Sequence, residues 1–139
     1  VDGAVSIGQS LAAIEYLDET HPEPPLLPGG AADRARIRSL ALDIACEIHP
    51  INNLRVLKYL TGELGASEEQ KLAWYRHWVE VGLAAVEARL AGNALTGRFC
   101  HGEHPTLADC CLVPQVFNAR RFGCRLDHVP TVVRIDTEC

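Results

Sequence analysis

A proline inside a strong helical pattern constrains this chain more than any other feature. Apolar residues recur with helical spacing across the stretch that contains it: Ile37, Leu40, Ala41, Ile44, Ile48 and Ile51. This stripe predicts one long amphipathic helix from Asp33 to about Gly62. Pro50 lacks a backbone N–H and its ring crowds the Cys46 carbonyl, at a cost of about 3 kcal/mol. We therefore expect the helix to bend or open at Pro50. A residue that opposes the helical preference of its neighbours in this way predicts a functional site.

A second helix is marked by a capping box, with Ser67 as N-cap and Gln70 three residues later. Its apolar pattern continues to Leu90. Gly82 lies on the apolar face, so we expect another helix to approach closely there. The aromatic residues of this helix are expected in the core or in an interface; they are Trp74, Tyr75 and Trp78.

A third helix begins at Thr106, with an acid three residues later at Asp109, which we interpret as a structural cap. The helix is apolar on almost every side, as is typical of a buried central helix, and Pro114 is expected to kink it. Pro130 then begins a last short helix. Residues 31–139 are therefore predicted to form an all-α domain, whose last helix is truncated.

The N-terminal part of the chain has a different pattern. Asp2-Gly3 is a hairpin turn signal, and residues 5–7 are expected to form an edge strand. Ser10 is the expected N-cap of a short amphipathic helix. Residues 1–22 are therefore predicted to be the strand–turn–helix remnant of another domain. The proline-rich residues 23–30 are predicted to be a linker whose leucines anchor it to a surface.

Composition argues against several classes of protein. The formal net charge of −5 argues against a nucleic-acid partner, and no apolar run approaches the roughly 18 residues of a membrane span. The six cysteines lack the spacing of a disulfide framework, so we expect reduced thiols in a cytoplasmic protein. The runs Cys46-x-x-His49 and Cys100-His101-x-x-His104 lack the paired short loops of structural zinc sites, so we expect no metal.

Three runs of residues together resemble the zeta class of the glutathione transferase superfamily. They are IGQSLAAIEYL at residues 7–17, HPINNLRVL at 49–57 and TLADCCLVPQV at 106–116. The resemblance covers almost the whole chain. It implies the C-terminal helical bundle of that superfamily, preceded by the last strand–turn–helix of a thioredoxin-like domain. Gly8 departs from the family pattern, which usually has a larger residue there.

The resemblance also implies an activity, the glutathione-dependent cis–trans isomerisation of maleylacetoacetate in aromatic amino acid catabolism. Glutathione would be the cofactor, a small dicarboxylate the substrate and a homodimer the assembly. The family's Ser-rich motif, which activates the thiol, lies outside these 139 residues. We therefore expect no catalytic residue in this chain and no activity from it alone. Because it begins with Val1 and ends within a helical pattern, we expect it to be a fragment.

The resemblance assigns glutathione contacts to residues whose positions already suit them. Gln9 and Ser10 stand where a helix begins, and its N-terminal N–H groups suit an anion; the resemblance implies that both bind the γ-glutamyl end. His49 and Asn53 are one turn apart and share a helix face. The resemblance implies that His49 and the run Asn53-Leu54-Arg55 line the glutathione pocket.

The arginines need separate treatment. Arg55 is two positions from Asn53, so on an ideal helix it points nearly the opposite way. It joins the site only if the Pro50 break reorients the turn, or if it acts across a dimer interface. The resemblance implies that Arg121 binds a substrate carboxylate, which a guanidinium grips with two parallel hydrogen bonds. Its neighbour Arg120 is expected at the surface.

Other functions fit the same pattern. Maleylpyruvate resembles maleylacetoacetate in what it demands of arginines, so an isomerase of maleylpyruvate is one alternative. A general conjugating transferase would favour an apolar second-substrate pocket. A non-catalytic binding module would have no need for the polar set, which comprises Gln9, Ser10, His49, Asn53 and Arg121.

Overall fold

The structure is a computed structural model that describes residues 2–139. Its elements, in chain order, are α1 (Ser10–Thr20), α2 (Ala31–Leu42), a π-helical segment η1 (Asp43–Ile48), a 3-10 turn η2 (Pro50–Asn52), α3 (Leu54–Gly62), α4 (Glu68–Leu90), α5 (Leu107–Arg121) and α6 (Pro130–Glu138). The described residues contain no strand, so the prediction of an all-α bundle is confirmed. None of the described helices is long and apolar enough to cross a membrane.

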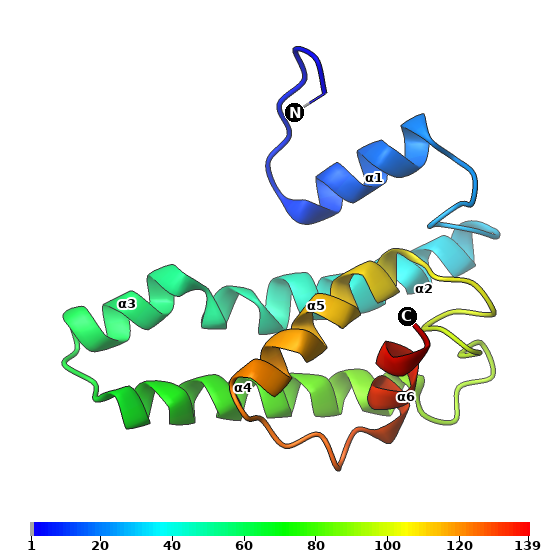
Figure 1. Ribbon diagram of the computed structural model, residues 1–139. Coiled ribbons are helices and arrows are strands. Elements are labelled where there is room, and N and C mark those ends of the chain that lie inside the picture. Colours follow the sequence, from blue (N-terminus) through cyan, green and yellow to red (C-terminus); the bar gives the residue numbers. More distant parts are fainter. Residues whose placement is uncertain (1) are drawn as a thin grey trace.

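The bundle is organised around α5. The α2 and α3 helices run along one side of the molecule and α4 along the other, while α5 crosses between them and α6 packs against α4 and α5 (Figure 1). The α1 helix lies outside the bundle, over α5 (Figure 1). The core contains the residues that the helical spacing predicted, among them Ile37, Leu40, Ile44, Ile48, Leu83, Leu107 and Leu112.

The single helix predicted for residues 33–62 is wrong, because the chain opens on both sides of Pro50. The residues before it, Asp43–Ile48, form a π-helical segment in which the His49 N–H donates to the Ile44 carbonyl at 2.9 Å. A proline removes a backbone donor and crowds the turn before it, and a widened turn relieves that conflict. The opening predicted at Pro50 is present, but it begins a full turn earlier than expected.

A new helix starts after this opening. Asn53 has extended backbone angles, φ −63° and ψ 149°, and its Oδ1 accepts a hydrogen bond from the Arg55 N–H at 3.2 Å. Asn53 is therefore the N-cap of α3. His49 and Asn53 were predicted to share one helix face, whereas in the structure the break between η1 and α3 separates them.

The close approach predicted at Gly82 is confirmed. A Cβ atom at this position would lie 2.4 Å from Cγ1 of Ile48, closer than real side chains come. Ile48 is the last residue of η1, so η1 contacts α4 at the position where Gly82 has no side chain. This contact positions the π-helical segment against α4, and His49 follows it directly.

Hydrogen bonds confirm both capping predictions. The Gln70 N–H donates to Ser67 Oγ at 3.1 Å, and the Ser67 N–H donates to Gln70 Oε1 at 2.8 Å. At the start of α5, the N–H and the hydroxyl of Thr106 donate to Asp109 Oδ2 at 2.7 and 2.8 Å. The Cys100 N–H donates to Asp109 Oδ1 at 2.9 Å. Asp109 therefore joins the helix start to the loop before it.

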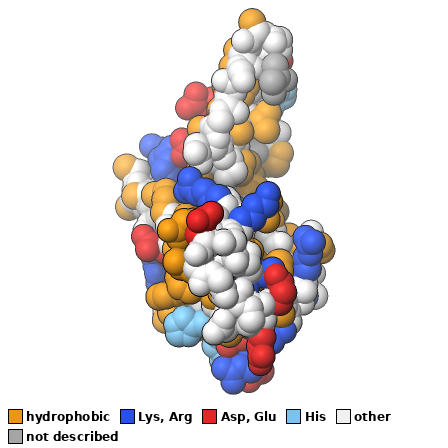
Figure 2. All heavy atoms as spheres, turned by 90° about the vertical axis from the view of Figure 1, so that its left-hand side faces the viewer, with side chains coloured by type: hydrophobic (Ala, Val, Ile, Leu, Met, Phe, Trp, Pro, Cys, Tyr) orange, Lys and Arg blue, Asp and Glu red, His pale blue; other side chains and the backbone are white. Residues whose placement is uncertain are grey.

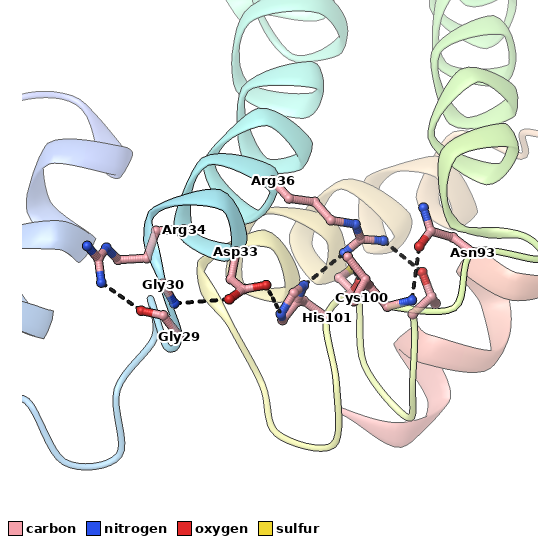
Figure 3. Close-up of polar contacts among 10 residues, drawn as sticks. Gly29, Gly30, Asp33, Arg34, Arg36, Asn93, Cys100 and His101 are labelled. Carbon is pink, nitrogen blue, oxygen red and sulfur yellow. Dashed lines mark hydrogen bonds and ion pairs between the residues drawn. The ribbon is translucent and has the colours of Figure 1, made fainter.

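The loop between α4 and α5 is also tied to α2, through Arg36 (Figure 3). The guanidinium donates to the Cys100 carbonyl and to Thr96 Oγ1, both at 2.9 Å, and lies 3.2 Å from His101 Nδ1. The other ring nitrogen of His101 is 3.7 Å from Asp33 Oδ1. His101, considered above as a zinc ligand, is thus engaged between an arginine and a carboxylate.

Two predictions for the N-terminal segment are wrong. The turn at Asp2-Gly3 is present and closed by two backbone hydrogen bonds, but residues 5–7 form only an isolated bridge with it and no strand. A strand needs a partner strand for its backbone groups, and the described chain offers none. Ser10 is not the N-cap, because it is already the first residue of α1. The preceding Gln9 has φ 69° and makes no side-chain capping bond.

The linker holds α1 against the bundle. Its two leucines pack against the core, as expected. The Leu26 N–H donates to Asp18 Oδ1 of α1 at 2.6 Å, and the Leu26 carbonyl accepts from the Leu107 N–H of α5 at 2.9 Å. Arg38 of α2 pairs with Glu15 of α1 at 2.7 Å. The position of α1 is therefore set by polar bonds as well as by apolar contacts.

Candidate ligand-binding cleft

A cleft of about 640 Å³ lies between the start of α1, the η1 segment and one face of α5. Its lining residues are Gln9, Ser10, Leu11, Ile14, Ile44, Ala45, Cys46, His49, Asn53, Cys110, Cys111, Pro114, Gln115 and Asn118. This set contains no aspartate, glutamate, lysine or arginine. The cleft therefore offers amides, a hydroxyl, an imidazole and thiols, and nothing in its lining repels an anionic ligand.

Figure 2 shows the N-terminal segment rising from the body of the bundle, with Lys and Arg side chains below it and Asp and Glu side chains among them. This face of the molecule therefore carries both signs of charge.

Gln9 and Ser10 line the cleft where α1 begins. The first turn of α1 contains no acidic residue, so its unpaired N–H groups and the positive end of the helix dipole are free to face an anion. The φ of 69° at Gln9 is uncommon for a residue with a side chain, and such strain concentrates at functional sites. The positions of both residues agree with the prediction that they bind the γ-glutamyl end of glutathione.

His49 and Asn53 also line the cleft, from the opening between η1 and α3. Asn53 uses its Oδ1 to cap α3, so the amide Nδ2 is the group left for a ligand. The His49 side chain makes no hydrogen bond to another described residue, and the residue is exposed. The break at Pro50 thus brings both polar groups to the cleft wall.

The three other predicted site residues lie outside the cleft lining. Leu54 is 63% exposed and Arg55 is exposed, and Arg55 contributes its backbone N–H to Asn53. Arg121 is exposed at the end of α5, with Cζ 5.6 Å from the centre of the Phe122 ring. It follows the cleft-lining Asn118 by three residues, so it lies one turn beyond the α5 wall.

The α5 wall was missed by sequence reasoning. Gln115 and Asn118 line the cleft one turn apart, and α5 remains helical through Pro114. The signal was available, since Gln115 is the polar residue within a run that is otherwise apolar: Leu112, Val113, Pro114 and Val116. Gln115 is 3% exposed, and its Nε2 has no hydrogen-bond partner in the described chain.

Thiols line the cleft on two sides. Cys46 and Cys110 are exposed, and Cys111 is buried. Burial raises the pKa of Cys111 to about 11, and burial together with the charge of Asp109 raises the pKa of Cys110. Near neutral pH both α5 thiols are therefore protonated and neutral. They shape the wall and are poor nucleophiles.

A second, smaller hollow of about 320 Å³ lies on the far side of α4. Two of its charged residues pair with each other, since Arg125 Nη2 lies 3.1 Å from Glu80 Oε2 and the Arg125 N–H donates to Glu80 Oε1 at 2.9 Å. That backbone N–H is the main reason why the pKa of Glu80 is lowered. In residues 2–139 no group of three or more His, Cys, Asp or Glu is arranged to hold a metal ion.

Comparison with known proteins agrees with this geometry. Residues 79–128 match the family model described as Glutathione S-transferase, C-terminal domain. A probable maleylacetoacetate isomerase of Vibrio cholerae is 50% identical over 135 residues, which are 97% of this chain and 62% of that protein. A holo structure of maleylpyruvate isomerase, a bacterial zeta-class glutathione S-transferase, matches with TM-score 0.96 and 47% identity, over 100% of this chain and 66% of that one. A structure of maleylacetoacetate isomerase from Anaeromyxobacter dehalogenans, with bound dicarboxyethyl glutathione and citrate, matches with TM-score 0.89 and 44% identity, over 100% of this chain and 63% of that one.

The chain therefore belongs to the glutathione S-transferase family. Within that family it is a homologue of the zeta class, which includes maleylacetoacetate and maleylpyruvate isomerases. The chain spans about three fifths of the length of the curated relatives it matches, between 62% and 65% for the first three.

Proposed function

We propose that this chain is the helical part of a glutathione-dependent cis–trans isomerase of the maleylacetoacetate type. The observation that carries the proposal is the cleft, which unites four predicted glutathione contacts from two separate parts of the chain: Gln9, Ser10, His49 and Asn53. A binding module without a small ligand would have no use for such convergence. The names of the relatives support the reaction class.

The cleft fits glutathione by its chemistry. The tripeptide has two carboxylates, an ammonium group and two amides. It therefore needs hydrogen-bond donors for its carboxylates and neutral hydrogen-bonding groups for its amides. The start of α1 at Ser10 suits a carboxylate, while His49 and Asn53 offer hydrogen-bonding groups on another wall. When bound, glutathione would supply a thiol that adds reversibly to a conjugated double bond. The residues of this chain hold and orient the peptide, and the group that activates its thiol is proposed to lie outside residues 1–139.

Arg121 is proposed to anchor a carboxylate of the second substrate. It is exposed at the end of α5, one turn beyond Asn118, and it makes no ion pair with another described residue. By contrast, its neighbour Arg120 pairs with Asp136 of α6. Arg121 is therefore available to a ligand at the cleft edge, where its guanidinium can form two parallel hydrogen bonds.

Leu54 and Arg55 are proposed to act through the backbone that they provide. The Arg55 N–H fixes the Asn53 side chain at 3.2 Å, and Leu54 forms the first turn of α3. Both residues would thereby orient the amide of Asn53 without lining the cleft.

The complete protein is further proposed to be a homodimer, which analytical ultracentrifugation tests directly.

The test uses the complete protein and assays isomerisation of maleylacetoacetate with and without glutathione. We expect activity only with glutathione, and none from residues 1–139 alone. His49→Ala should weaken glutathione binding measured by calorimetry, whereas His77→Ala, an exposed histidine of α4 outside this cleft, should not. Absence of glutathione binding to the complete wild-type protein would refute the proposal.

A second variant pair tests the substrate anchor. Arg121→Ala should raise the KM for the dicarboxylate about tenfold or more, because a charge-assisted bidentate contact is lost. Arg120→Ala, next to it on the helix, should leave that KM unchanged. Equal KM values for both variants would remove Arg121 from the site.

The alternative functions predict different results in the same assays. Faster turnover of maleylpyruvate than of maleylacetoacetate would favour a maleylpyruvate isomerase, the name carried by a Ralstonia relative that is 47% identical. Conjugation of apolar electrophiles without isomerisation would favour a general transferase. Glutathione binding without either reaction would favour a binding module.

A further inference from the structure

Gln115 occupies an unusual position in α5. The residue is 3% exposed, and its Nε2 is buried without any hydrogen-bond partner among residues 2–139. It nevertheless belongs to the lining of the cleft. The side chain is thus almost wholly enclosed by protein, in a residue that borders the cleft.

An unpaired buried donor is costly, because the amide has lost its hydrogen bonds to water and gained none from the protein. Two other buried polar residues, Asp109 and Glu87, avoid this penalty. Asp109 accepts three hydrogen bonds, and Glu87, which is 9% exposed, accepts from the N–H groups of Thr131 and Val132 at 3.1 and 2.9 Å. Asn52 also has an unpaired atom, its Oδ1, but that residue lies outside the cleft lining. Gln115 therefore combines an unsatisfied donor with a place in the lining of the cleft.

The position of Gln115 on α5 indicates which ligand it serves. The proposed glutathione contacts come from the start of α1 and from the opening between η1 and α3, whereas Gln115 is on the helix that carries Asn118 and then Arg121. Each of these three residues follows the previous one by three positions, so successive side chains are neighbours on the helix surface. The α5 wall thus leads from a neutral donor to a free guanidinium.

We propose that Gln115 Nε2 donates a hydrogen bond to an oxygen acceptor, a carboxylate or the conjugated carbonyl, of the unsaturated acid substrate. This inference rests on the function proposed above. The cleft lining contains no Asp, Glu, Lys or Arg, so an oxygen that gains negative charge there would meet a fixed donor and no carboxylate. Such a donor stabilises developing charge more strongly there than in water.

The test compares two probes on the complete protein by calorimetry. Glutathione reports on the peptide contacts alone, and dicarboxyethyl glutathione adds two carboxylates in place of the substrate. Gln115→Leu removes the donor and keeps a similar volume. We expect it to weaken binding of dicarboxyethyl glutathione about tenfold or more, with binding of glutathione changed less than twofold. Gln115→Glu, which has a similar shape but no amide donor, should weaken binding of dicarboxyethyl glutathione at least as much.

The ligand-free protein provides a second readout. Because Gln115→Leu removes an unpaired buried group, we expect its Tm to be equal to or higher than that of the wild type. A purely structural role would lower the Tm and leave the ratio of the two affinities unchanged, and that result would overturn the inference. Equal weakening of both probes would also overturn it. Wild-type protein that binds neither probe would instead refute the proposed function, so the two failures are distinguishable.

Discussion

Asp109 and Gln115 lie on the same helix, less than two turns apart, and both are almost fully buried, at 2% and 3% exposure. Both carboxylate oxygens of Asp109 have partners, because they accept hydrogen bonds from Thr106 and Cys100. The Nε2 of Gln115 has no partner. Burial alone makes the two residues look alike. Their hydrogen bonds separate a polar residue that stabilises the fold from one that we propose binds a ligand.

The largest expected effect is on the structural side of this comparison. Asp109→Ala in the complete protein leaves two buried backbone N–H groups, those of Thr106 and Cys100, without acceptors. Each such loss costs about 1–3 kcal/mol, so we expect the free energy of unfolding to fall by about 3 kcal/mol or more. Urea denaturation measures this change.

Asp127→Ala is the matched control, because Asp127 is exposed and accepts no hydrogen bond from a described residue. It should change the free energy of unfolding by less than about 0.5 kcal/mol. If Asp109→Ala were equally mild, the contrast between Asp109 and Gln115 would not hold.

The next effect concerns the wall that faces Gln115 across the cleft. Gly82→Ala places a Cβ atom 2.4 Å from Cγ1 of Ile48, and such overpacking costs about 1–3 kcal/mol. The strain falls on the last residue of η1, next to His49, so we expect weaker glutathione binding together with a lower Tm.

Gly62→Ala makes the same change at the end of α3, where a Cβ atom would meet nothing within 4 Å. It should raise stability by up to about 1 kcal/mol, because alanine favours the helix. If both variants changed the stability in the same direction, the contact between α4 and η1 would not position the cleft wall.

A smaller effect sharpens the location of the ligand. Cys46 and Cys110 are exposed in the cleft on opposite walls, whereas Cys139 is exposed outside the cleft lining. We expect S-methylglutathione to slow alkylation of Cys46 and Cys110 by iodoacetamide several-fold, with Cys139 as the internal control. Peptide mass spectrometry follows the three rates in one sample, and equal slowing at all three would argue against binding in the cleft.

The smallest effect is a pH dependence of stability. Burial raises the pKa of Cys111 to about 11, and burial followed by the charge of Asp109 raises that of Cys100. In the unfolded chain these thiols ionise near their ordinary pKa of about 8.5–9. Above that pH unfolding releases protons, so the free energy of unfolding falls as pH rises from about 9 to 11.

The variant Cys111→Ala should have a shallower slope over this range, measured by urea denaturation at each pH. Its absolute stability will also change, because a side chain is lost, so the slope is the quantity to compare. A slope equal to that of the wild type would indicate that Cys111 ionises equally in both states.

Much of the fold was predictable because its causes are local. The Ser67 and Thr106 caps depend on groups within three residues, and the apolar stripe from Ile37 to Ile51 marks the buried face. Of the predicted site residues, His49 and Asn53 line the cleft. Their contact with glutathione stays a prediction.

The misses share a cause, which is dependence on distant partners. Residues 5–7 need another strand before they can form one. The opening around Pro50 extends into a π-helical segment, whose last residue packs against Gly82 of α4. Arg121 and Arg55 lie outside the cleft lining, and their roles at the site stay predictions.

The sequence by itself determined where α4, α5 and α6 begin, that Pro50 interrupts a helix and where Gly82 allows a close approach. Each of these depends on backbone chemistry within one turn, or on a missing side chain. Only the tertiary structure decided that α1, η1 and α5 enclose a cleft and that Gln115, which borders it, has an unpaired donor. A hydrogen bond is unmade only with respect to all the groups around it, and those groups come from segments far apart in the chain.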